Sequence, residues 1–217
     1  MVKGLKTVSV IDALAASLRD RVLDGGLVAG ATLTETEVAE QYEVSRPTAK
    51  TAISMLVQSG LLRREAHKTA YVPRLSDVDI HDLFLVRIPL ELAVVERIAG
   101  MHAALGGAEQ AVRDIAAVPA DGAHSVFVEA DLRFHQELVD VVGSRRLSSL
   151  YALLTGEIHL SMVQSRFALG RDRIFGEHAA VLAAIKAGDA AQATSLMRDH
   201  LTGAQHALAE QLLIGDS

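Results

Sequence analysis

Residues 34–60 read TETEVAEQYEVSRPTAKTAISMLVQSG, a pattern that predicts two short helices separated by a tight turn. Thr34 and Glu37 have the spacing of a capping box, in which each side chain accepts a hydrogen bond from the other residue's backbone N–H. Ser45 is a second N-cap residue and begins the next helix. The connection at residues 42–44 has about the length found in helix-turn-helix motifs.

The segments on either side of this motif complete a small domain. Residues 10–23 have the apolar spacing of a helix, and two glycines follow them. After the motif, residues 61–64 and 70–72 are short strand candidates joined by a polar turn at residues 65–69. Three helices followed by a hairpin predict a winged helix-turn-helix domain.

Residues 44–75 are strongly basic within an acidic chain. The net charge of the chain is −6, whereas this segment carries six Lys or Arg side chains and a single acidic one. Arg46 and Lys50 lie four residues apart and therefore share one face of the predicted helix. Thr48 and Thr51 lie beside that face. Such a helix N-terminus offers donors to phosphates and to base edges in the major groove, so DNA binding is favoured over an ordinary solvated face.

The composition excludes several other classes of protein. The chain has no cysteine, so it has no disulfide, thiolate metal site or cysteine nucleophile, in agreement with a cytoplasmic protein. The N-terminus lacks the apolar core of a signal peptide, and no run of about 18 apolar residues occurs. We therefore expect a cytoplasmic protein without a membrane partner.

Residues 76–217 predict an all-α bundle of six helices, so the expected domains are residues 1–75 and 76–217. Pro89 is expected to kink the first helix of the bundle. The expected helices lie near residues 76–101, 108–117, 125–142, 145–165, 173–187 and 190–213.

Three helices of this bundle each place a histidine on their apolar stripe. Asp131 and His135 lie one turn apart on one helix, and His178 and His200 lie on two others. A single buried histidine is usually satisfied by a hydrogen bond, but three of them and a carboxylate each need a partner. One Zn²⁺, Ni²⁺, Mn²⁺ or Fe²⁺ ion would satisfy all four. Periodicity alone leaves a metal-free polar network equally open, with His159 as a spare candidate.

The motifs together resemble the GntR family of bacterial transcription regulators, in its FadR-like subgroup with an FCD effector domain. Six helices in the second domain resemble the shorter, VanR-like branch. The resemblance covers nearly the whole chain, with its motifs in the family's order. They are residues 44–53, 60–62, Arg87 with residues 90–91, residues 131–135, 177–178, 184–185 and 188–189, and Ala193, Met197 and residues 200–201.

The resemblance implies a ligand-responsive regulator, expected to be a repressor, that binds operator DNA as a homodimer. It implies a divalent metal ion, zinc first with nickel or manganese as alternatives, held by Asp131, His135, His178 and His200. It also implies a small carboxylate effector, which Arg87 helps to bind. The expected DNA-binding residues are Ser45, Arg46, Thr48, Lys50, Thr51, His67 and Lys68.

Two departures from the family pattern affect the DNA-binding residues. Lys50 stands where many members have an arginine, which replaces a bidentate donor with a point charge. The predicted wing turn has Ala66, His67 and Lys68 where a glycine is usual. A hydrolase with a metal-activated water is the alternative function, although no base or nucleophile is paired with the expected ligands. A structural metal or a metal-free network is the third interpretation.

Overall fold

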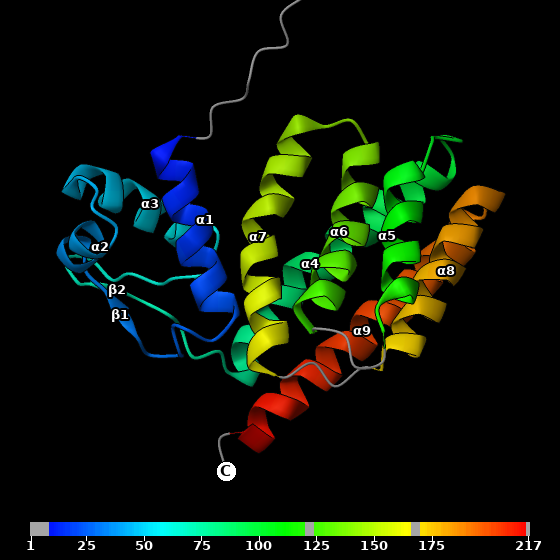
Figure 1. Ribbon diagram of the computed structural model, residues 1–217. Coiled ribbons are helices and arrows are strands. Elements are labelled where there is room, and N and C mark those ends of the chain that lie inside the picture. The colour runs from blue at the N-terminus through cyan, green and yellow to red at the C-terminus, as the bar shows by residue number, and fades with distance from the viewer. Residues whose placement is uncertain (1–8, 120–123, 166–169, 216–217) are drawn as a thin grey trace, which may run out of the picture. The chain divides into compact units, whose positions relative to one another are not determined.

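The computed structural model describes residues 9–119, 124–165 and 170–215, and most of them are helical (Figure 1). The chain divides into two compact units, Met1–Arg74 and Leu75–Ser217. In the described ranges, the only sheet has two short strands. The predicted fold class, mostly α with a winged helix-turn-helix and an all-α bundle, is confirmed.

The first unit contains α1 (Val10–Leu23), α2 (Glu35–Gln41) and α3 (Arg46–Gln58). The helix starts follow the predicted caps. Thr34 and Glu37 form the capping box of α2, and the side chain of Ser45 accepts a hydrogen bond from the backbone N–H of Thr48 at 3.2 Å. The two signals that set the helix-turn-helix are therefore both present in the structure.

Apolar side chains from all three helices form the core of the first unit. Both α1 and α2 pack against α3, whose apolar face is completely buried. Burying a leucine or isoleucine side chain contributes about 1.5–3 kcal/mol, so this small core fixes the orientation of α3. Its buried members include Leu14, Leu18, Val22, Val38, Ala49, Ala52, Ile53 and Leu56.

The strand pairing differs from the predicted hairpin. β2 (Ala70–Tyr71) pairs antiparallel with β1 (Thr32–Leu33), which precedes α2 and for which the sequence predicted no strand. Arg63 forms only an isolated bridge with Tyr71. The backbone at Leu61 and Leu62 packs against the end of α3 instead. The backbone N–H of Leu62 donates to the carbonyl of Leu56, and both leucines are buried. The prediction that residues 61–64 form a strand was therefore wrong.

His67 occupies the left-handed backbone region, with φ of 63°, at the tip of the wing. A side chain in this region costs about 1–2 kcal/mol, and glycine does not incur that cost. We expect His67→Gly to raise the unfolding free energy of the first unit by about 1 kcal/mol, as measured by urea denaturation of the full chain. Lys68→Gly, beside it and at negative φ, is the control and should not stabilise. Equal unfolding free energies of wild-type and His67→Gly protein would contradict backbone strain at His67.

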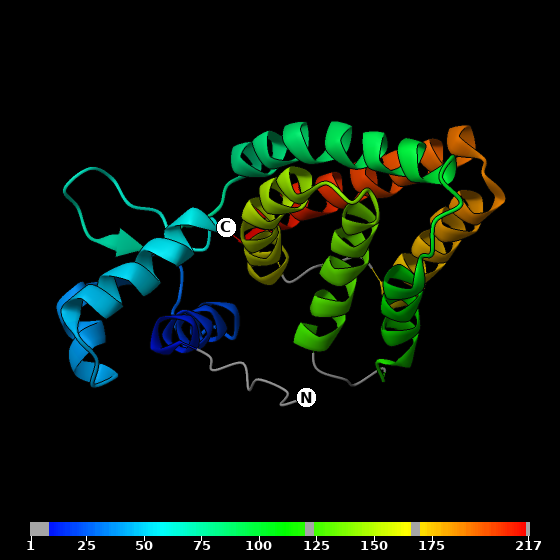
Figure 2. The ribbon, with the colours of Figure 1, turned by 90° about the horizontal axis from the view of Figure 1, so that it is seen from above.

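The second unit is built from helices α4 to α9. α4 and α9 pack against each other more extensively than any other pair, and Figure 2 shows them side by side. None of the helices in the described ranges has the length and apolarity of a membrane span. The bounds are α4 (Asp77–Ala99), α5 (Gly106–Ala117), α6 (His124–Val141), α7 (Arg145–Gln164), α8 (Arg171–Ala187) and α9 (Ala190–Gly215).

Pro89 lies inside α4, which continues through it as one helix. Proline has no N–H, so the carbonyl of Leu85 loses its helical partner. Leu85 and Pro89 are both exposed, so water can donate a hydrogen bond to that carbonyl. The helix therefore stays continuous and carries its buried face, with Arg87 and Glu91, past the proline.

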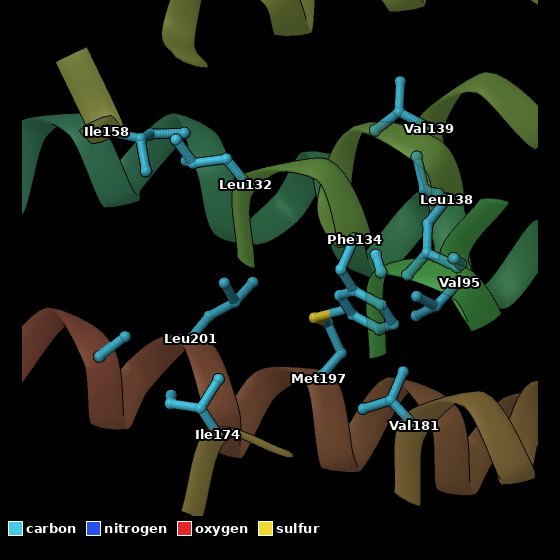
Figure 3. Close-up of a cluster of buried hydrophobic side chains, with 14 of the residues drawn as sticks. Val95, Leu132, Phe134, Leu138, Val139, Ile158, Ile174, Val181, Met197 and Leu201 are labelled. Carbon is cyan, nitrogen blue, oxygen red and sulfur yellow. The ribbon is translucent and has the colours of Figure 1, made fainter. Parts of the chain in front are cut away.

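The core of the second unit surrounds α6. Phe134 is fully buried, and Figure 3 shows its ring close to Met197 of α9 and Val181 of α8. Leu138 continues the same stripe of α6 one turn later. This packing holds α6, α8 and α9 together at the level where the side chains of Asp131 and His135 project from α6.

Candidate metal centre and basic surface

Four buried side chains from three helices converge at one point in the second unit. Asp131 and His135 come from α6, His178 from α8 and His200 from α9. One ligand atom from each lies within 4.8 Å of the others. The Nε2 atom of His200 is 3.3 Å from Nε2 of His135 and 3.3 Å from Nε2 of His178. The stripe analysis therefore selected residues that the fold brings together.

The donor atoms suit a divalent cation. Zinc bonds to imidazole nitrogen are about 2.0–2.1 Å long, which gives a tetrahedron with donor separations of about 3.3 Å. Oδ1 of Asp131 is buried without a hydrogen bond in the described part of the chain, and it lies 3.5 Å from Nε2 of His178. A buried carboxylate oxygen without a donor is costly unless a cation satisfies it. The cluster thus fits a metal ion better than it fits an uncharged core.

A second set of polar side chains surrounds His135. Glu91 of α4 is 2 % exposed and accepts hydrogen bonds from Nε of Arg87 at 2.6 Å and from the hydroxyl of Tyr151 at 2.7 Å. Its other oxygen lies 2.5 Å from Nδ1 of His135. Sequence reasoning gave Glu91 and Tyr151 no role. The available signal was the spacing of Arg87 and Glu91, which places two opposite charges one turn apart on a buried face.

The protonation states follow from this arrangement. Burial opposes ionisation of Glu91, but the hydrogen bonds from His135 and Arg87 and the charge of Arg87 outweigh it and lower the pKa of that carboxyl. Burial lowers the pKa of His135, with Glu91 acting in the opposite direction. Burial, together with His200 and His135, lowers the pKa of His178 well below its usual value. Neutral imidazole is the form that binds metal ions.

The other imidazoles are held in different ways. Nδ1 of His200 lies 2.8 Å from Oε2 of Glu177, whose Oε1 accepts from Nε of Arg173 at 2.6 Å. The ring of His178 stacks on Phe134, with centroids 4.0 Å apart. Glu177 was noted in the sequence as part of a motif, without a role. His159, the spare candidate, is not a member of the four-residue cluster.

A separate groove lies on the outer side of α4 and α9. It has a volume of about 950 Å³ and is lined by residues such as Leu85, Pro89 and Arg198. None of the four converging residues lines it, nor does Arg87 or Glu91. The groove therefore does not provide access to the cluster.

Three of the expected DNA-binding residues form an exposed surface on α3. Arg46, Lys50 and Thr51 are exposed on α3, opposite its buried face. Ser45 caps the helix, and its hydroxyl lies 2.8 Å from the hydroxyl of Thr48. These two hydroxyls thus serve the helix start.

The wing extends this surface. His67 and Lys68 are exposed, and with Arg46 they line a hollow of about 260 Å³. Arg64 also lines the hollow, 3.7 Å from Glu35. Sequence reasoning counted Arg64 in the basic segment and did not select it. Four cationic or imidazole side chains around one hollow on a helix-turn-helix are suited to a phosphate backbone.

Family comparisons agree with both units. Residues 11–72 match the model for bacterial regulatory proteins of the gntR family, and residues 82–203 match the FCD domain. The HTH-type transcriptional regulator BphR of Paraburkholderia xenovorans (strain LB400) is 28% identical over 209 residues, which covers 89% of this chain and 82% of that protein. A D-xylose utilization operon transcriptional repressor of Paenarthrobacter nicotinovorans is 25% identical, covering 87% and 85% of the two chains.

A solved structure shows the same fold. The GntR-type transcriptional regulator from Rhodococcus sp. RHA1 superposes with a TM-score of 0.79 at 24% identity, covering 93% of this chain and 98% of that one. These relatives are named as regulators, so the hydrolase alternative gains no support. The chain belongs to the GntR family, with an FCD domain, and is a DNA-binding transcription regulator.

Proposed function

We propose that this regulator is a metal-containing repressor whose second unit senses a small organic acid. Residues 1–75 bind operator DNA, and residues 76–217 form the effector domain and hold two chains together as a homodimer in the cytoplasm. Zinc is the preferred ion, with nickel or manganese as alternatives, because three imidazoles and one carboxylate suit each of them.

The observation that carries this proposal is the convergence of Asp131, His135, His178 and His200 inside a regulator of this family. When bound, the ion would supply a positive charge that attracts a carboxylate, and the four residues would hold it. Their burial keeps water from competing for the ion. Repression is supported by the name of the Paenarthrobacter relative, "Probable D-xylose utilization operon transcriptional repressor".

Arg87 supports a carboxylate effector. It is 3 % exposed and is paired with Glu91, which also contacts His135. A guanidinium has five N–H donors, and the hydrogen bond from Nε to Glu91 uses one of them. An acid bound between Arg87 and the ion would share the guanidinium with Glu91.

The DNA-binding role makes Arg46 a sensitive position. We expect Arg46→Ala to weaken binding about 10- to 100-fold, because it removes a donor to base edges or phosphate at the start of α3. The measurement is fluorescence anisotropy with a labelled DNA fragment from upstream of the protein's own gene. Wild-type affinity should also fall steeply as salt rises.

Arg19→Ala is the matched control, since Arg19 is an exposed arginine on α1, outside the basic segment. Its affinity should equal that of the wild type. Equal losses in the two variants would show a general charge effect instead of a contact by α3. Wild-type protein that binds no fragment, with or without candidate acids, would contradict the repressor proposal.

A further inference from the structure

Two imidazoles of the cluster, those of His135 and His200, are each hydrogen-bonded to a glutamate and have the same orientation. His135 and His200 turn their Nε2 atoms toward each other, at 3.3 Å, and each presents Nδ1 to a carboxylate outside the cluster. An ionised carboxylate accepts hydrogen bonds and cannot donate them. In each of these hydrogen bonds, Nδ1 must therefore carry the proton. The Nε2 lone pair then faces the centre of the cluster in both rings. That is the tautomer a metal ion needs at this position.

We propose that Glu91 and Glu177 are positioning residues that fix the tautomer and ring orientation of His135 and His200 and thereby set the metal affinity of the cluster. This inference rests on the proposed metal site. An imidazole that is free to rotate or to change tautomer must be ordered when the ion binds, which weakens binding. A carboxylate on Nδ1 removes that cost before the ion arrives.

The two carboxylates are themselves held, by different neighbours. Glu91 is buried and accepts from Arg87 and Tyr151 as well as from His135. The side chain of Glu177 is 26% exposed and accepts from Arg173. Both positions are therefore built by side chains from at least two helices, and neither carboxylate contacts its imidazole as an isolated pair.

The guanidinium of Arg173 lies beside Gly203 of α9, where a Cβ atom would lie 2.6 Å from its Nη2. Arg173 and Glu177 lie four residues apart on α8, so both side chains project from one face of that helix. The ion pair on α8 thus holds the carboxylate of Glu177 beside Nδ1 of His200.

His178 has no such acceptor, since its Nδ1 atom makes no hydrogen bond within the described ranges. Its ring is instead stacked on Phe134, with an interplanar angle of 14°. Two imidazoles are thus fixed through Nδ1 and the third by its ring face.

The contribution of Glu177 can be tested without disturbing the buried ion pair at Glu91. The test compares zinc affinity in wild-type, Glu177→Ala and Glu177→Gln protein by competition with a chromophoric chelator. We expect Glu177→Ala to bind zinc about 10- to 100-fold more weakly. Glu177→Gln should lose less, because its amide oxygen can still accept the hydrogen bond from Nδ1. Glu210→Ala, an exposed glutamate on α9, is the control and should match the wild type.

Two further readouts separate positioning from a general structural effect. The visible spectrum of the cobalt-substituted protein should change in Glu177→Ala and stay closer to wild type in Glu177→Gln. The melting temperatures of the metal-free variants should remain near that of the metal-free wild type, because Glu177 is partly exposed. Affinity that falls equally in both variants, together with lower metal-free melting temperatures, would overturn the positioning role.

The remaining outcomes distinguish this inference from the proposed function. Zinc affinity in Glu177→Ala equal to wild type would overturn the positioning role and leave the metal site in place. Wild-type protein that binds neither zinc nor cobalt would overturn the metal site itself. A large loss of zinc affinity in Glu177→Ala and a smaller loss in Glu177→Gln is the expected result.

Discussion

Replacing Arg87 with alanine should lower the unfolding free energy of the metal-free protein by about 3–5 kcal/mol. Arg87 and Glu91 are both almost completely buried and share a hydrogen bond of 2.6 Å. Removing one partner leaves the other charge in the core without compensation, and that penalty exceeds the value of the pair. Glu91 would keep only its contacts with Tyr151 and His135. Urea denaturation of chelator-treated protein measures the change.

Two control proteins sharpen this experiment. Arg97→Ala removes an exposed arginine of the same helix and should change the unfolding free energy by less than about 0.5 kcal/mol. The double variant Arg87→Met with Glu91→Leu removes both charges and should recover part of the loss, because no unpaired charge remains buried. A small effect of Arg87→Ala, similar to that of Arg97→Ala, would contradict the buried ion pair.

Replacing His135 with alanine should abolish stabilisation by zinc. Free zinc at about 100 times its dissociation constant stabilises a protein by about 2.7 kcal/mol. For a chain of this size that corresponds to roughly 5–10 °C in melting temperature. Wild-type protein should show this increase, and His135→Ala should not, because the variant lacks one of the four converging ligands. Thermal denaturation with zinc and with chelator provides the comparison.

His159→Ala is the control for the histidine substitution. His159 lies on α7, outside the four-residue cluster, so the variant should retain the full zinc-dependent increase. Loss of the increase in both variants would indicate zinc binding elsewhere. An equal increase in wild-type and His135→Ala protein would contradict a site built on His135.

The features that sequence reasoning predicted correctly depend on local patterns. The caps at Thr34 and Ser45 act within one helical turn, so they are visible in a few residues. The four converging residues were visible because each interrupts an apolar stripe, and a buried polar side chain needs a partner. His178 and His200 then had to meet inside the same core. Burial turned three separate local signals into one site.

The features that were missed depend on contacts between distant segments. β1 has two residues and is a strand only because Thr32 and Leu33 pair with β2, which follows the whole helix-turn-helix in the sequence. Tyr151 reaches Glu91 from α7, 60 residues along the chain. No periodicity within either helix specifies that pair. The buried charges at residues 87 and 91 were the available clue.

The most direct test of the central claim is the metal content of the wild-type chain, purified without a histidine tag and measured by elemental analysis. We expect close to one zinc, nickel or manganese ion per chain, and a fall in melting temperature when a chelator removes it. Metal-free protein that shows no change in melting temperature with zinc or chelator would contradict the claim. The four buried side chains would then form a polar network without an ion.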